Sequence, residues 1–290
     1  MKRLVALMGL LTILLCGCGA QAAPADIAAT TLPVYEFTQR LCHGTGLTVT
    51  RLVTESVSCL HDYTLNVSQV KAAEQADHIV ISGAGLEDFM ADLLQDKSVI
   101  DASSGIALLE SCHRHDHDHE HHHAESFDAH IWLSPDNALV MAQNIYGGLL
   151  KAYPEHQAAF EQNLSALTAD IQALQAYGDA QLANIKSEEI ITFHDGFSYF
   201  AAYYDLHIVR AIEEESGAEA SAAELIDIIS ALREHSIRAI FTETNGSTSA
   251  AGIIAAETGA AVYTLDMAMA GESWFDAMYR NIDTIKEALE

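Results

Sequence analysis

Segments with the length and apolar content of β-strands alternate along this chain with segments of helical periodicity. The predicted strands lie at residues 27–32, 47–53, 78–82, 98–102, 189–193, 238–242 and 261–265. The predicted helices lie at residues 33–41, 68–76, 86–94, 135–153, 197–204, 221–235 and 250–258, with one more at the C-terminus. Alternation of this kind with short connections is typical of parallel sheets flanked by helices, so we expect an α/β protein.

One longer periodic segment separates the two halves of this pattern. Its apolar stripe consists of Phe160, Leu164, Leu167, Ile171, Leu174, Leu182 and Ile185, interrupted at Gly178. A helix of about thirty residues would span roughly 45 Å, enough to cross from one lobe to another; a coiled-coil helix is the alternative. We therefore expect two lobes, 26–152 and 187–290, each with a small parallel sheet, joined by one long rigid helix over 153–186.

The N-terminus has the features of a bacterial lipoprotein signal. A basic start precedes an apolar run at residues 4–15, which is too short for an ordinary membrane-spanning helix. Cys18 follows the small residue Gly17, as a lipidated cysteine does, whereas Cys16 follows a leucine. We expect a signal peptide at 1–18, a spacer at 19–25, and an extracytoplasmic mature protein, anchored by lipid in the periplasm or on the outer face of the cytoplasmic membrane.

The chain is strongly acidic, with a formal net charge of -27 at pH 7. This charge repels nucleic acid and anionic lipid and attracts cations. Nucleic acid is therefore excluded as an expected partner.

A histidine-rich loop at residues 113–123 interleaves imidazoles with carboxylates. Its seven histidines are His113, His115, His117, His119, His121, His122 and His123. Such a segment favours a multidentate trap for zinc, copper or nickel over a merely solvated loop. We expect it to collect metal or to sense zinc excess.

Four other residues stand out as metal ligands. His61, His194 and Asp266 follow predicted strands, and His130 precedes the helix start Ser134-Pro135. Ligands bind at the carboxyl ends of strands in open α/β sheets, so these residues can converge in a cleft between the lobes. Three imidazoles and one carboxylate suit zinc, whereas manganese prefers more oxygen.

Two cysteines flank these candidates. Cys59 lies just before His61, and Cys112 opens the histidine-rich loop. A disulfide between Cys59 and Cys112 is expected in an oxidising compartment, with thiolate ligation of zinc as the alternative and Cys42 left free.

Several short motifs together resemble one family, the metal-specific solute-binding lipoproteins of ABC transporters (cluster A-I), which are zinc and manganese uptake receptors. In chain order they are CLHDY at 59–63, AD at 76–77, SGAGLE at 82–87, DAHIWLSP at 128–135, FHDGFSYF at 193–200, FTE at 241–243 and LD at 265–266. Their order and spacing cover nearly the whole mature chain.

The resemblance implies that His61 and His130 are the ligands of the first lobe and that His194 and Asp266 are those of the second. Manganese members tend to carry glutamate at the position of His194, so histidine there points to zinc. Leu60 and Met267 stand where the family usually has prolines, which leaves water as the alternative to Asp266 as fourth ligand. Glu243 and Asp195 are then expected to support the ligands from behind.

The resemblance also implies a function, a monomeric high-affinity receptor that delivers Zn²⁺ to the membrane permease of an ABC importer and is not an enzyme. A manganese receptor of the same family is one alternative. From other classes, a zinc hydrolase fits three histidines with an open position, and a surface metal buffer or adhesin fits the histidine-rich loop. No well-placed general base accompanies the histidines.

Overall fold

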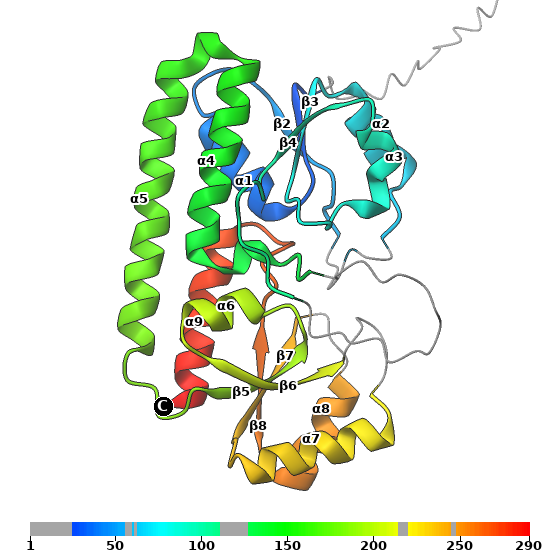
Figure 1. The fold of residues 1–290 in the computed structure, drawn as a ribbon, viewed down its shortest axis with the longest axis vertical. Helices are drawn as coiled ribbons and strands as arrows, with labels where there is room; N and C mark the ends of the chain where they lie inside the picture. Colours follow the sequence, from blue (N-terminus) through cyan, green and yellow to red (C-terminus); the bar gives the residue numbers. More distant parts are fainter. Residues whose placement is uncertain (1–24, 56–59, 61–62, 111–126, 214–219, 245–247) are drawn as a thin grey trace, which may run out of the picture.

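The computed structural model describes residues 25–55, 60, 63–110, 127–213, 220–244 and 248–290. Within these residues the chain forms two lobes, each built on a four-stranded parallel sheet, with long helices along one side of both (Figure 1). The expected two-lobe α/β class is therefore confirmed.

The first lobe has the strand order β2-β1-β3-β4, with every neighbouring pair parallel. Its elements are β1 (Ile27–Ala29), α1 (Leu32–Leu41), β2 (Val49–Arg51), α2 (Val67–Gln75), β3 (His78–Ile81), η1 (Asp88–Met90), α3 (Ala91–Leu94) and β4 (Ser98–Asp101). The helix predicted over 86–94 is thus only two short pieces. Glu87 turns inward there and accepts hydrogen bonds from the backbone of Ser82 and Gly83, which fixes the start of the segment.

One long helix connects the lobes, as expected, and a second helix packs antiparallel against it. After η2 (Ile131–Leu133), α4 (Pro135–Ala152) begins with Pro135 in its first turn and with Ser134 as N-cap, as predicted. η3 (Pro154–His156) then leads into α5 (Gln157–Leu182), whose 26 residues span about 39 Å and run past both sheets (Figure 1). Gly178 lies inside α5 and does not interrupt it.

The second lobe repeats the strand order of the first as β6-β5-β7-β8, again all parallel. Its elements are β5 (Glu189–His194), α6 (Ser198–Tyr203), β6 (His207–Glu213), α7 (Ala222–Glu234), β7 (Ala239–Glu243), α8 (Thr248–Thr258), β8 (Ala261–Leu265) and α9 (Trp274–Leu289). The capping box predicted for α7 is present, with Ser221 and Glu224 bonded reciprocally. Strand β6 was not predicted from the sequence.

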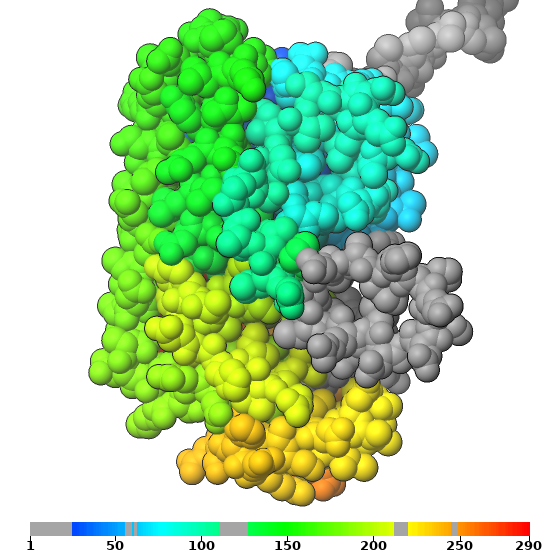
Figure 2. Space-filling view, in the orientation of Figure 1, coloured from blue at the N-terminus to red at the C-terminus, as the bar shows by residue number. Residues whose placement is uncertain are grey.

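The lobes share one hydrophobic core. A single cluster of buried residues includes Phe37 and Trp132 of the first lobe together with Phe200, Trp274 and Met278 of the second. Figure 2 shows the surfaces of the two lobes in direct contact beside the long helices. The lobes are therefore packed against each other as well as connected.

The segment between Asp266 and α9, residues 267–273, crosses to the first lobe, and we call it the strap. The carbonyl of Met267 accepts the Trp132 indole N–H at 2.7 Å, and that of Met269 accepts the Leu32 N–H at 3.2 Å. Arg51 donates to the carbonyl of Gly271 at 2.8 Å.

The C-terminal end of the strap is also hydrogen-bonded to the first lobe. Glu36 of α1 accepts the Trp274 N–H at 2.5 Å and the Ser273 hydroxyl at 3.2 Å, and the Trp274 indole donates to the Trp132 carbonyl at 3.1 Å. The strap is thus a second connection between the lobes. Among the described residues, no helix is both long and apolar enough to cross a membrane.

Candidate metal centre

Two of the predicted ligands meet between the lobes. His194 is the last residue of β5, and His130 immediately precedes η2. Their ring centroids lie 5.3 Å apart with the ring planes at 84°, and only 4% of His130 and 7% of His194 is exposed. The fold therefore brings together two imidazoles that are 64 positions apart in the chain, from different lobes.

Asp128 orients the ring of His130. Its Oδ1 accepts the His130 backbone N–H at 2.8 Å and lies 2.7 Å from His130 Nδ1. A carboxylate can only accept at that nitrogen, so Nδ1 carries a proton, and in the neutral ring Nε2 carries the lone pair. Nε2 is buried and has no hydrogen-bond partner among the described residues. This is the tautomer that a metal ligand needs, and an aspartate behind a ligating histidine is a common arrangement.

The segment around Asp128 is held by the second lobe. Tyr199 of α6 donates its hydroxyl to the carbonyl of Asp128 at 2.9 Å and accepts the Leu109 N–H at 3.0 Å. The His130 ring also lies beside Trp132, with centroids 5.3 Å apart. The first-lobe histidine is therefore fixed by contacts on several sides.

Gly196 lies where the two histidines approach each other. A Cβ atom at this position would be 3.1 Å from Cδ2 of His194, 3.3 Å from Cδ2 of His130 and only 2.3 Å from Cε of Met267. Even a Cβ here would force the Met267 methyl to move aside and would press on both rings, so glycine lets these three side chains pack closely. Asp128, Gly196 and Met267 were not predicted to act at the site, although the Asp-x-His spacing is a signal for Asp128.

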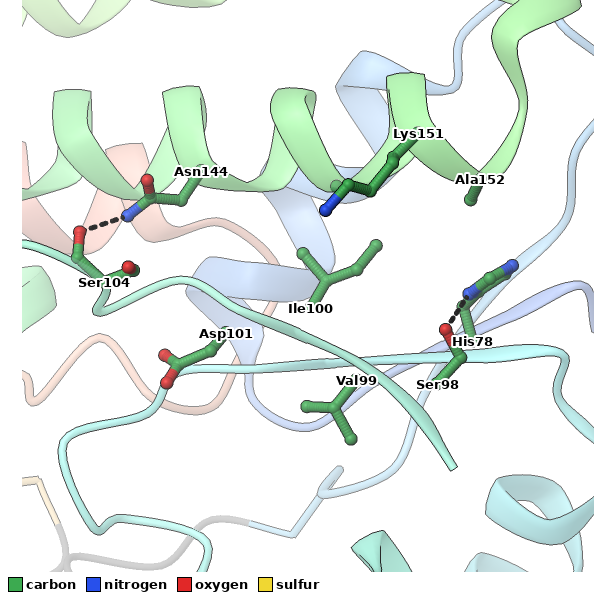
Figure 3. A pocket seen from close by; sticks show the side chains of 10 residues that line it. His78, Ser98, Val99, Ile100, Asp101, Ser104, Asn144, Lys151 and Ala152 are labelled. Carbon is green, nitrogen blue, oxygen red and sulfur yellow. Dashed lines mark hydrogen bonds between the residues drawn. The ribbon is translucent and has the colours of Figure 1, made fainter. Parts of the chain in front are cut away.

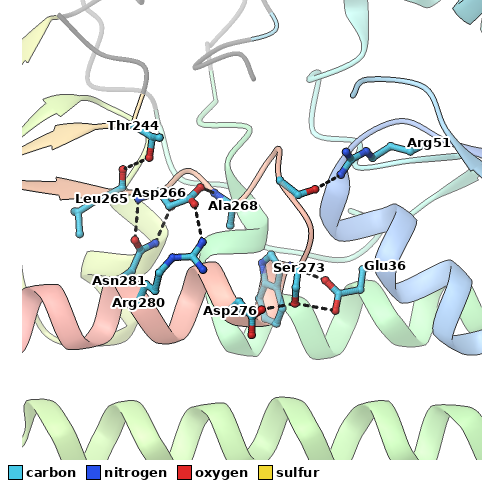
Figure 4. Close-up of polar contacts among 12 residues, drawn as sticks. Glu36, Arg51, Thr244, Leu265, Asp266, Ala268, Ser273, Asp276, Arg280 and Asn281 are labelled. Carbon is cyan, nitrogen blue, oxygen red and sulfur yellow. Dashed lines mark hydrogen bonds and ion pairs between the residues drawn. The ribbon is translucent and has the colours of Figure 1, made fainter. Parts of the chain in front are cut away.

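Asp266 directly follows β8 and is held by α9 (Figure 4). Asn281 accepts its backbone N–H at 2.8 Å and donates to its carbonyl at 2.7 Å. Its carboxylate accepts the Ala268 N–H at 2.8 Å and pairs with Arg280 at 3.0 Å. Within the described part of the chain, no three His, Cys, Asp or Glu side chains gather as a metal site, so Asp266 does not join the two histidines in this structure.

The two predicted supporting carboxylates lie in the same region of the second lobe. Glu243 ends β7 and is in register with Leu265, the residue before Asp266, while Asp195 directly follows His194. Both are 6% exposed. The carboxyl ends of β5, β7 and β8 thus place His194, Glu243 and Asp266 along one edge of the sheet.

The remaining predicted residues lie outside the described residues. These are His61, the lipidation site Cys18, the proposed disulfide partners Cys59 and Cys112, and the whole histidine-rich loop. Cys42 is a buried free thiol, and burial raises its pKa to about 12.

A separate hollow of about 450 Å³ lies between β4 and the C-terminal half of α4 (Figure 3). Its walls include His78 and Ser98, the first residues of β3 and β4, and Lys151 of α4. None of the predicted ligands lines it, so it is distinct from the histidine pair.

The chain is similar in sequence to curated zinc-binding proteins. The chain is 30% identical over 285 residues to the zinc-binding lipoprotein AdcA of Streptococcus pneumoniae serotype 4 (strain ATCC BAA-334 / TIGR4), covering 91% of this chain and 56% of that protein. The chain therefore spans about half the length of these AdcA relatives.

Solved structures show the same fold. A crystal structure of ZnuA superposes with a TM-score of 0.79 at 28% identity, covering 92% of this chain and all of that one. The Zn(II)-bound AdcA of S. pneumoniae gives a TM-score of 0.77 at 27% identity, covering 92% of this chain and 58% of that one. The family model described as "Zinc-uptake complex component A periplasmic" (ZnuA) matches residues 27–288. The chain therefore belongs to this family of zinc-uptake components.

Proposed function

We propose that this chain is an extracytoplasmic receptor that binds Zn²⁺ and delivers it to the permease of an ABC importer. The observation that carries the proposal is the His130 ring, whose Nδ1 is bonded to Asp128 and whose buried Nε2 is left for a cation beside His194. The family description and the zinc-binding name of the pneumococcal relative support zinc as the cargo.

The proposed ligands are His61, His130, His194 and Asp266. Buried neutral imidazoles suit zinc, and four N and O ligands would close a tetrahedral shell. Asp266 lies at the same sheet edge as His194, and leaving Arg280 would free it to bind the ion. Water is the alternative fourth ligand, and a variant of Asp266 tests which of the two binds the ion.

The protein would bind and release zinc without catalysing a reaction. We propose a monomer anchored through a lipid on Cys18, with a Cys59–Cys112 disulfide. The histidine-rich loop at 113–123 would collect zinc or sense its excess, whereas delivery would take place at the buried histidine pair.

The proposal is tested by zinc stoichiometry and affinity of the purified protein, measured by elemental analysis and by competition with a chelator. One tight zinc per chain is expected, and it should survive deletion of residues 113–123. His130→Ala and His194→Ala should each weaken it by well over about 100-fold, more than loss of a group behind a ligand costs. His207→Ala, which removes an imidazole 69% exposed elsewhere in the second lobe, is the matched control and should change nothing.

Two results would contradict the proposal. If tight zinc vanished with the loop and were indifferent to His130 and His194, the protein would be a surface buffer and not a transport receptor. Tighter binding of Mn²⁺ than of Zn²⁺ by the intact protein would instead make it a manganese receptor.

A further inference from the structure

Met267 forms one wall of the histidine pair. Its Cε lies 2.3 Å from the point that a Cβ on Gly196 would occupy, and that point is 3.1 Å and 3.3 Å from the Cδ2 atoms of His194 and His130. The side chain is 5% exposed and belongs to the core cluster shared by the lobes. Its terminal methyl therefore fills the space that glycine leaves open beside both imidazoles.

The backbone of Met267 is fixed in place from both lobes. Met267 follows Asp266 in the second lobe, yet its carbonyl accepts the indole N–H of Trp132 in the first lobe at 2.7 Å. Trp132 in turn lies against the His130 ring. Residue 268 is bonded to the Asp266 carboxylate, so the backbone on the other side of Met267 is held too.

A buried methyl beside two ligands affects metal ions differently. Zinc is satisfied by four ligands in a tetrahedron, whereas manganese favours six, mostly oxygen, and would need water to complete its shell. An apolar side chain offers a metal-bound water no strong hydrogen-bond acceptor and removes the volume that the water would occupy. The Met267 side chain thus disfavours a high coordination number of the bound ion without changing the ligands themselves.

We propose that Met267 is a specificity-determining residue, whose side chain excludes additional water ligands and so favours four-coordinate zinc over six-coordinate manganese. The inference rests on the proposed function, because it assumes that His130 and His194 bind the cargo ion. It assigns selectivity to an apolar side chain rather than to the ligand set alone.

The chain offers a matched control for this idea. Met269 is the same residue type in the same strap, is 1% exposed, and also has its carbonyl bonded to the first lobe, by Leu32. The atoms closest to the Gly196 position nevertheless belong to Met267, His194 and His130. Met267→Ala and Met269→Ala both create a cavity in the core and should destabilise the protein similarly; only the first opens space at the metal.

The experiment measures zinc and manganese affinities of the full protein by competition with chelators, at a temperature where every variant is folded. Met267→Ala should lower the ratio of zinc to manganese affinity by on the order of tenfold. Met267→Leu, which keeps the apolar volume, and Met269→Ala should keep the wild-type ratio. With Co²⁺ as a spectroscopic probe, Met267→Ala alone should lose the intense visible absorption of four-coordinate cobalt.

Three outcomes would overturn the inference. The ratio could stay unchanged in Met267→Ala, or fall equally in Met269→Ala, which would mean general loosening of the strap. It could also fall equally in Met267→Leu, which would assign the effect to sulfur and not to volume. Failure of the proposed function looks different, because wild-type protein would then bind no tight zinc that depends on His130 or His194.

Discussion

Asp128 determines which nitrogen of His130 is available to a metal ion. Replacing it with alanine removes the acceptor for Nδ1–H, so the ring can rotate or adopt the other tautomer. We expect Asp128→Ala to weaken zinc binding by about 10–100-fold, the usual cost of losing a group behind a ligand.

A charge-matched control separates this effect from the loss of one negative charge. Asp179→Ala, an exposed acid on α5, should leave zinc affinity within error of the wild type. Nitrogen NMR of the imidazoles would show directly whether the Nδ1–H tautomer of His130 persists in Asp128→Ala. Retention of that tautomer together with full affinity would refute the role given to Asp128.

Glu87 is a buried acid that ties together the carboxyl ends of two strands. Its carboxylate accepts the Thr30 hydroxyl at 2.6 Å and the backbone N–H groups of Ser82 and Gly83 at 2.8 and 2.9 Å. Burial raises its pKa to about 7, with the charge of Asp101 adding to the shift. The folded protein therefore binds this proton more tightly than the unfolded chain does.

The raised pKa of Glu87 determines how the stability of the protein changes with pH. A raised pKa contributes stability that is fully present below the unfolded value near 4.5 and is lost as pH rises through about 7. Between pH 5 and pH 8 this one group should lower the free energy of unfolding by on the order of 3 kcal/mol. Glu87→Gln should be less stable than the wild type at pH 5, because an amide cannot accept both N–H groups. Its free energy of unfolding, measured by denaturant titration, should also vary less with pH. An equally steep decline in the variant would assign the effect to other groups.

Among the elements, α5 shows how packing overrides a local rule. Gly178 is helical, and alanine at most helical glycines stabilises a helix by about 1 kcal/mol. A Cβ at this position, however, would lie 2.3 Å from the Tyr204 hydroxyl oxygen and within 2.6 Å of two ring carbons. Gly178→Ala should therefore destabilise the protein by about 1–3 kcal/mol, as overpacking does.

Gly147 of α4 is the control for this prediction. It is exposed, and nothing lies within 4 Å of the corresponding Cβ. Gly147→Ala should stabilise the protein by roughly 0.5–1 kcal/mol. Thermal or denaturant unfolding of both variants tests the pair, and a gain in stability for Gly178→Ala would show that Tyr204 moves aside readily.

Arg280 of α9 pairs with the Asp266 carboxylate at 3.0 Å, and variants of this pair test whether Asp266 or water is the fourth ligand. The Arg280 side chain is 62% exposed, and such surface pairs contribute about 1 kcal/mol at most. If Asp266 binds zinc, Arg280→Gln should raise zinc affinity by no more than about fivefold. Asp266→Asn should lower it and should cancel the gain in the double variant, whereas a water ligand predicts no change in any of the three.

Most elements could be predicted from the sequence because their signals are local. Ser134-Pro135 and Ser221 with Glu224 mark helix starts through bonds within one turn, and both appear as predicted. Strand β6 alternates apolar and polar residues only weakly, from His207 to Glu213, and pairs with β5 through an irregular register. Its assignment depends on that neighbour, so the local pattern did not suffice.

The candidate site likewise has some residues that local sequence signals predict and some contacts that depend on distant elements. His194 could be predicted as a ligand because it ends a strand of a parallel sheet, and His130 because it lies next to a helix start. The close approach of Met267 to Gly196 and the pairing of Asp266 with Arg280 depend on the positions of the strap and of α9. No spacing in the sequence encodes them.

For the whole molecule, the strap limits how far the lobes can separate. It bonds the second lobe to Trp132, Leu32, Arg51 and Glu36 of the first, in addition to the helices on the other side. We expect the radius of gyration from small-angle scattering to be the same with and without zinc. Removing two ties in the double variant Glu36→Ala, Arg51→Ala should make the zinc-free form measurably larger, and a large change in the wild type would contradict a tight strap.

The strap also gives the molecule an intrinsic optical reporter. The chain has 2 tryptophans, and both Trp132 and Trp274 are fully buried where the lobes meet, bonded to each other through indole and carbonyl. Tryptophan fluorescence therefore comes entirely from the contact between the lobes, and one of the two indole rings lies beside His130. Any movement of the lobes during capture or release of the ion can thus be followed in real time in the unlabelled native protein.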